Sequence, residues 1–235
     1  MLTSLLNGQV LAQRFGSEPA RVVALHGWGR EHGDWELVLQ GLDALALDLP
    51  GFGMSGTPPS AWGARDYAKF LSPLIAQTPG VVVVGHSFGG RVVVCLAADN
   101  PNVAGIVLTG VPLVRLEPAS RPKLTYRLLR ALHDKGLVFA LQMESVRRRY
   151  GSADYVNAEG IMRNVLVKVV GEQYFEELNA TSSPVRLVWG AEDKVMPSLV
   201  AEHALTLNPH ATLTMVPQSG HLIDLKRSRF DAASF

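Results

Sequence analysis

The chain has 235 residues, of which 47% are hydrophobic and 18% charged, and its net charge of +1 favours neither nucleic acid nor a membrane surface as the main partner. The single cysteine, Cys95, excludes an intramolecular disulfide and a thiolate metal cluster, and its apolar surroundings indicate a small buried side chain. The first residues do not resemble a signal peptide and no apolar run is long enough to cross a bilayer, so we expect a cytoplasmic protein.

The chain opens with a predicted β-hairpin. Asn7-Gly8 lies between the short runs 2–6 and 9–14, and an Asn-Gly pair readily takes positive φ at both central turn positions. Six apolar runs of strand length follow, at residues 21–25, 44–49, 81–85, 103–108, 185–189 and 212–216. Most are nearly continuous and rich in β-branched residues, which is typical of parallel strands buried on both faces.

Helical patterns alternate with these strands, at residues 34–42, 66–77, 87–99 and 195–205. Asp34 and Asp66 stand where they favour a first helical turn, and Pro197 suits the first turn of the last helix. The alternation predicts an α/β fold with a mostly parallel, eight-stranded sheet flanked by helices.

A long interval, residues 111–184, separates two of the predicted strands. A usual crossover between parallel strands needs far fewer residues. The interval is rich in helical patterns, at residues 124–143, 154–170 and 171–179. We therefore expect residues 1–110 and 185–235 to form the core and residues 111–184 to form an inserted helical cap.

Ser87 is the candidate nucleophile. Gly85-His86-Ser87-Phe88-Gly89 fits the pattern G-x-S-x-G, follows a valine-rich strand and opens a helical pattern. A tight strand-to-helix turn exposes the serine Oγ and requires small neighbours. Two other interpretations are a plain helix N-cap and a phosphate-binding turn. The spacing of a phosphate-binding loop is absent, because Arg91 follows Gly90 without a Lys-Ser/Thr pair.

A serine nucleophile needs a base, and the base needs an orienting acid. In the nucleophile-elbow fold these follow the serine in the order acid, then histidine. Asp193, at the end of a predicted strand, is the preferred acid, with Glu192 as the fallback. His221 follows the last strand and is preferred as base to His203, inside a helical pattern, and to His210, in a connection. The alternative is that both are solvated loop residues.

Two backbone N–H groups are expected to stabilise the oxyanion of acyl transfer. One is that of Phe88, directly after the nucleophile. The other is that of Trp28, in the loop His26-Gly27-Trp28-Gly29 that follows the first long strand. The Trp28 side chain is equally consistent with core packing alone.

Together these motifs resemble the α/β-hydrolase superfamily in order and spacing, from Val22 to His221 apart from the cap; they include Asp-Leu-Pro-Gly-Phe-Gly-Met-Ser at 48–55, Gly-Ala-Glu-Asp at 190–193 and Ser-Gly-His at 219–221. The resemblance implies a Ser-His-Asp enzyme without cofactor or metal, acting on esters, amides, thioesters or certain C–C bonds. The Trp28 loop and the 48–55 motif are similar to those of carboxylesterases that cleave pimeloyl-carrier-protein methyl ester. The segment from Ser87 to Arg91 is similar to a triad lyase of the menaquinone pathway.

The expected cap is basic in its first half. Between Val114 and Tyr150 nine Lys and Arg residues stand against three Asp and Glu, a charge that would steer a carboxylate substrate or an acidic carrier protein. The alternative is a solvated helical face. Arg91 is either a carboxylate anchor or an exposed helix residue. We predict hydrolysis of a small-molecule ester or thioester, and the alternatives are a triad-based lyase and a receptor-like binding protein.

Overall fold

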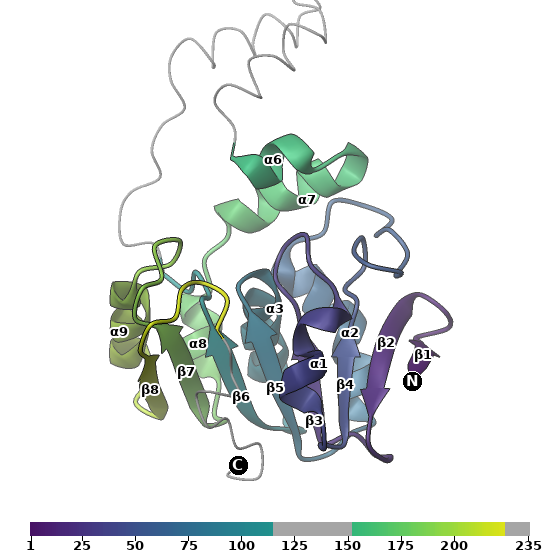
Figure 1. The fold of residues 1–235 in the computed structure, drawn as a ribbon, viewed down its shortest axis with the longest axis horizontal. Coiled ribbons are helices and arrows are strands. Elements are labelled where there is room, and N and C mark those ends of the chain that lie inside the picture. The colour runs from purple at the N-terminus through teal and green to yellow at the C-terminus, as the bar shows by residue number, and fades with distance from the viewer. Residues whose placement is uncertain (115–151, 224–235) are drawn as a thin grey trace, which may run out of the picture.

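The computed structural model describes residues 1–114 and 152–223. Its centre is an eight-stranded sheet in the order β1-β2-β4-β3-β5-β6-β7-β8 (Figure 1). The pairs β1–β2 and β2–β4 are antiparallel, and every pair from β4 to β8 is parallel, which confirms the mostly parallel sheet. The strands are β1 (Leu2–Leu5), β2 (Val10–Phe15), β3 (Val22–Leu25), β4 (Ala44–Leu47), β5 (Val81–His86), β6 (Val103–Thr109), β7 (Val185–Gly190) and β8 (Ala211–Val216).

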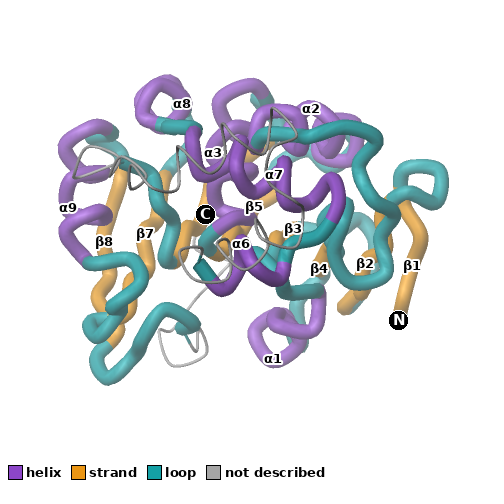
Figure 2. Tube along the Cα trace, turned by 90° about the horizontal axis from the view of Figure 1, so that it is seen from above, coloured by secondary structure: helices purple, strands orange, loops and turns teal. Residues whose placement is uncertain are grey.

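Helices cover both faces of this sheet. Figure 2 shows α1 on one face and α2, α3 and α8 on the other, with α9 next to α8. The buried side chains divide in the same way, into a small cluster that includes Trp35 and Leu39 and a large one that includes Leu71 and Val93. The helices are η1 (a 3-10 turn, His32–Trp35), α1 (Glu36–Leu39), α2 (Ala64–Ala76), α3 (Phe88–Asp99), α6 (Ala153–Asn157), α7 (Gly160–Gly171), α8 (Phe175–Ala180) and α9 (Ser198–Leu207).

The N-terminal hairpin forms, but its turn is longer than predicted. Leu5 lies opposite Val10 in the β1–β2 register, so residues 6–9 make the connection rather than Asn7-Gly8 alone. Leu6, Asn7 and Gly8 have φ values of 50°, 59° and 86°. Leucine seldom adopts a positive φ, so the composition of the turn did not reveal its length.

Three helix boundaries differ from the sequence prediction. The pattern at 34–42 forms the 3-10 turn η1 and a short α1 that ends at Leu39. α2 begins before Asp66, because the Asp66 carboxylate accepts the N–H of Gly63 at 2.8 Å and so caps the helix from its third position. Pro197 lies at the N-cap of α9 rather than inside its first turn.

The described part of the inserted segment forms α6, α7 and α8. The single helix expected at 154–170 is broken, because Ala158 and Glu159 have extended backbone conformations between α6 and α7. Figure 1 shows α6 and α7 above the sheet, whereas α8 contacts α3 and α9 in the layer on the sheet face. The helix expected at 124–143 and the basic stretch lie outside the described residues, and the division into core and cap remains a prediction.

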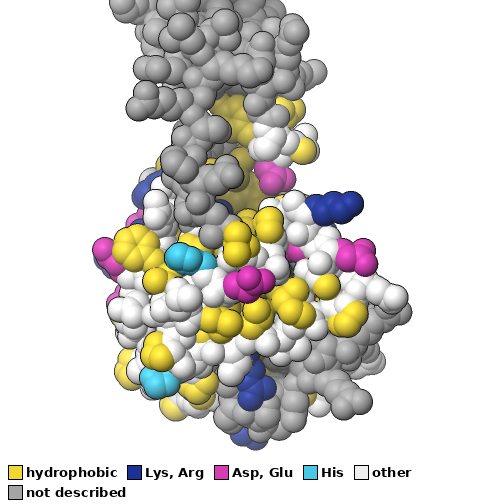
Figure 3. All heavy atoms as spheres, turned by 90° about the vertical axis from the view of Figure 1, so that its left-hand side faces the viewer, with side chains coloured by type: hydrophobic (Ala, Val, Ile, Leu, Met, Phe, Trp, Pro, Cys, Tyr) yellow, Lys and Arg dark blue, Asp and Glu magenta, His cyan; other side chains and the backbone are white. Residues whose placement is uncertain are grey.

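β8 is a half-buried edge strand and not a strand buried on both faces. Thr212, Thr214 and Met215 are exposed along it. Figure 3 views this end of the molecule and shows hydrophobic side chains scattered among polar atoms. Among the helices of the described ranges, none combines the length and the hydropathy that a membrane span requires.

Candidate active site

Ser87 lies on the tight turn between β5 and α3. Its backbone has φ 48° and ψ −109°, a combination that a residue other than glycine adopts only when its surroundings enforce it. Glycines make the turn possible: a Cβ at Gly85 would lie 2.5 Å from Gly90 Cα, and one at Gly89 would lie 2.4 Å from the carbonyl oxygen of Leu25. Ser87 stands at the N-cap position of α3, as that interpretation held, but its side chain makes no capping hydrogen bond to the helix.

Asp193 and His221 meet from the loops that follow β7 and β8. His221 Nδ1 is 2.8 Å from Asp193 Oδ2, and Asp193 Oδ1 accepts the N–H groups of Val195 and Met196 at 2.9 and 2.8 Å. Only 1% of the Asp193 side chain is exposed, so it is not a solvated turn residue. The fallback acid, Glu192, is exposed. Because Nδ1 of His221 is engaged, its Nε2 is the nitrogen left for a proton-transfer partner.

Ser87 and His221 line one cavity of about 780 Å³. The loop that contains Trp28 forms one wall, Phe52 lies beside it, and α6 and α7 contribute a further wall. His203 and His210 are exposed elsewhere and do not line this cavity. A cavity of this size suits a small-molecule substrate. The lining residues are Gly27, Trp28, Gly29, Arg30, Gly51, Phe52, His86, Ser87, Asp154, Asn157, Ala158, Glu159, Met162, Val195 and His221.

The two expected oxyanion donors flank the elbow. Phe88 is the first residue of α3, so its N–H has no acceptor within the helix. The Trp28 ring packs edge-on against Phe52 and Phe88, with ring centres 4.9 and 5.4 Å apart. The indole is therefore a packing group, as the alternative interpretation held, while Trp28 also lines the cavity. The role of the two N–H groups in binding an oxyanion remains a prediction.

The model of the alpha/beta hydrolase family matches residues 22–233 of this sequence. The chain belongs to the alpha/beta hydrolase family. It is 28% identical to Esterase Rv0045c of Mycobacterium tuberculosis, over 94% of this chain and 83% of that protein. It is 27% identical to a pimeloyl-[acyl-carrier protein] methyl ester esterase of Nitrosomonas europaea, over 85% of this chain and 88% of that protein. The solved structure of a thermophilic esterase has the same fold, with a TM-score of 0.68, 22% identity, and coverage of 97% of this chain and 92% of that one. The expected fold and the resemblance to esterases are confirmed.

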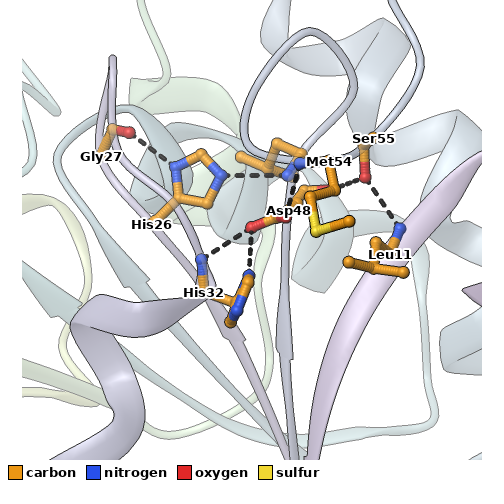
Figure 4. Close-up of polar contacts among 8 residues, drawn as sticks. Leu11, His26, Gly27, His32, Asp48, Met54 and Ser55 are labelled. Atoms are coloured by element: carbon orange, nitrogen blue, oxygen red, sulfur yellow. Dashed lines mark hydrogen bonds and ion pairs between the residues drawn. The ribbon is translucent and has the colours of Figure 1, made fainter. Parts of the chain in front are cut away.

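The hydrolase contains a buried polar network beside the Trp28 loop that the sequence did not predict. His26 is fully buried; its Nε2 accepts the N–H of Leu49 at 3.0 Å, so its Nδ1 carries the hydrogen that bonds to the carbonyl of Gly27 at 2.7 Å (Figure 4). Burial lowers the pKa of His26, which favours this neutral tautomer. The ring thus ties the loop after β3 to the start of the loop after β4.

Asp48 forms the second half of the network. Its Oδ1 accepts the N–H of His32 at 2.7 Å and lies 2.8 Å from His32 Nδ1, and its Oδ2 accepts the N–H of Met54 at 2.9 Å (Figure 4). Ser55 Oγ donates to the Asp48 carbonyl and accepts the N–H of Leu11. In the sequence, the motif at residues 48–55 was the one feature that pointed to these contacts. The network holds the loop that carries Trp28.

Asp48→Ala is expected to lower the free energy of unfolding by about 3 kcal/mol, because it leaves two partly buried backbone donors and an imidazole without their acceptor. Urea denaturation measures this loss. Asp43→Ala is the matched control, since Asp43 accepts the N–H of Ser17 in an exposed hydrogen bond, and its loss is expected to stay below about 1 kcal/mol. Equal losses in the two variants would contradict the role assigned to Asp48.

Arg91 contacts the inserted helices and does not line the cavity. Its Nη1 donates to the carbonyl of Val169 near the end of α7, and its guanidinium lies 5.6 Å from the ring centre of Tyr174. The side chain is partly buried. Arg91 is therefore not the exposed helix residue of one interpretation, and the carboxylate-anchor interpretation stays a hypothesis.

Proposed function

We propose that this hydrolase is a serine esterase that cleaves carboxylic esters or thioesters through an acyl-enzyme. The observation that carries the proposal is the shared cavity: Ser87, on its strained elbow, lines the same cavity as His221. The Nδ1 of His221 is bonded to the buried carboxylate of Asp193. This is the arrangement in which an acid orients a base toward a serine nucleophile.

In the proposed reaction His221 Nε2 takes the proton of Ser87 Oγ as that oxygen attacks the ester carbonyl. The N–H groups of Trp28 and Phe88 stabilise the oxyanion of the tetrahedral intermediate. When the intermediate collapses, the carbonyl–alkoxy bond breaks and His221 returns the proton to the leaving alcohol. A water molecule, deprotonated by His221, then attacks the acyl-enzyme and releases the acid and free Ser87.

The substrate class follows from the relatives and from the size of the cavity. Esterases among the relatives support a small-molecule ester or acyl substrate. The name of the pimeloyl-[acyl-carrier protein] methyl ester esterase makes an acidic acyl carrier protein a proposed partner for this chain too. The basic residues between Val114 and Tyr150 that would attract it lie outside the described part of the chain.

The proposal is tested with p-nitrophenyl acetate and butyrate and with a fluorophosphonate probe. We expect turnover of both esters, and mass spectrometry is expected to find the probe on Ser87. A folded protein that neither turns over the esters nor reacts with the probe would overturn the proposal. A ligand-dependent rise in melting temperature without product would instead support the receptor-like alternative.

Arg91→Met tests whether Arg91 binds a substrate carboxylate, as the lyase alternative requires. We expect the ratio of kcat/KM for a monoester of a dicarboxylic acid to that for a neutral ester to change by less than about twofold. The melting temperature is expected to fall by about 2–4 °C, because the guanidinium bond to the Val169 carbonyl and the cation contact with the Tyr174 ring are both lost. Arg30→Met is the comparison variant, since Arg30 does line the cavity. A selective loss of about tenfold for the carboxylate ester in Arg91→Met would restore the anchor interpretation.

A further inference from the structure

His86 directly precedes Ser87 and is held by the ends of two neighbouring strands. It is the last residue of β5 and is 6% exposed. Its Nδ1 lies 2.8 Å from Thr109 Oγ1, at the end of β6. On another side the ring lies against Gly27, where a Cβ would stand 2.8 Å from His86 Cδ2. A hydrogen bond and close packing therefore fix this imidazole.

The fixed His86 ring packs against the ring of His221. The ring centres are 4.8 Å apart and the ring planes are inclined at 59°. Gly110 borders both rings, because a Cβ there would lie 2.8 Å from His221 Cε1 and 3.3 Å from His86 Cε1. The hydrogen bond from His221 to Asp193 fixes one ring atom but does not fix the ring plane. The contact with His86 supplies the second constraint that a defined plane needs.

His86 also stands between two cavities. It lines the cavity of about 780 Å³ that contains Ser87, and it lines a second cavity of about 240 Å³. The second cavity is mostly apolar, with Trp35, Val38 and Ile223 among its lining residues. If the His86 ring were shortened, His221 would border open space on this side, and its own ring would be free to tilt away from Ser87.

We propose that His86 is a positioning residue that holds the His221 imidazole against Asp193 with Nε2 directed toward Ser87. This inference rests on the proposed function, because it assigns His86 a part in orienting the base of that reaction. When His221 accepts the proton of Ser87 it becomes positively charged. A neighbour in ring contact must then be neutral, since two like charges at this distance repel each other.

The surroundings of His86 meet this requirement. Burial, followed by the charge of His221, lowers the pKa of His86 to about 4. The other charged groups that act on it are Asp34, which raises its pKa, and Arg30, which lowers it. These two side chains are paired with each other, and Thr109 contributes an uncharged partner. At neutral pH His86 is therefore uncharged, and it does not compete for the proton that His221 takes from Ser87.

The test combines NMR with kinetics on the full chain. The Nδ1–H of His221, bonded to Asp193, gives a proton resonance that needs no substrate and reports how firmly the ring is held. In His86→Asn we expect this proton to exchange with water at least about tenfold faster than in the wild type. We expect kcat per active site, counted with the fluorophosphonate probe, to fall about tenfold, with KM changed by less than about twofold.

Thr109→Val keeps the ring and removes its hydrogen bond, so it provides a second variant if His86→Asn does not fold. Its effects are expected in the same direction and smaller, at about threefold. His210→Asn, at an exposed position, is the control and should change neither measurement. Wild-type exchange and wild-type kcat per site in both folded variants would overturn the role of His86. Absence of turnover and labelling in the wild type would overturn the esterase proposal instead. The exchange rates measured by NMR would still show whether His86 holds the His221 ring.

Discussion

Ser87→Ala is expected to lower kcat for p-nitrophenyl butyrate by at least about a thousandfold, to the residual rate that the oxyanion donors and substrate binding alone support. The variant lacks the oxygen that forms the acyl-enzyme, so no later step can proceed through it. The melting temperature should stay near that of the wild type, because the Ser87 side chain caps no helix. Intact-protein mass spectrometry should also show that the variant no longer gains the mass of the fluorophosphonate adduct.

A second serine separates the nucleophile from a general effect of removing a hydroxyl. Ser60 lies exposed in the segment between β4 and α2, and Ser60→Ala is expected to retain wild-type turnover and labelling. If Ser87→Ala kept more than about a tenth of the wild-type kcat and still took up one probe molecule, the nucleophile would be another residue. The elbow would then be a structural turn only.

Much of the fold is predictable from the sequence because buried parallel strands require continuous apolar runs. β5 and β7 each extend only one residue beyond the runs that predict them, to His86 and Gly190. Predictions fail where a distant contact or an unusual backbone angle decides the local structure. The turn of the first hairpin begins at Leu6 with a positive φ, and α6 and α7 are separated by extended backbone at Ala158 and Glu159. Hydrophobic periodicity does not register either feature.

The candidate site also has residues that the sequence predicts and contacts that it does not predict. Ser87, Asp193 and His221 stand in short motifs at strand ends, so chain order and position after a strand together select them, and the structure places the last two in contact. His86 and Arg91 stand in or beside the same elbow, but their partners lie 23 and 78 residues away in the chain. Spacing within a motif carries no information about such contacts. For this reason Arg91 had two interpretations from spacing alone, and the structure contradicts the one that leaves its side chain exposed.

Asp193→Asn is expected to lower kcat by about a thousandfold or more while the protein stays folded. The amide oxygen can still accept the N–H groups of Val195 and Met196, which bond to Oδ1 in the wild type at 2.9 and 2.8 Å. The amide nitrogen would then face His221 Nδ1 as a donor. That contact favours the tautomer with its hydrogen on Nε2, which cannot take a proton from Ser87, and it removes the negative charge that stabilises the imidazolium.

Glu192→Gln is the matched control, because it removes the same charge one residue away, from an exposed side chain. We expect its kcat to stay within about twofold of the wild type in the same ester assay. The reverse result, a large loss in Glu192→Gln and near-normal kcat in Asp193→Asn, would make Glu192 the acid. It would also mean that the bond between Asp193 and His221 serves stability rather than turnover. Asp193→Asn and Glu192→Gln together therefore show what makes a carboxylate the acid of the triad. The property is either burial with direct contact to the imidazole, or a position on the loop after β7.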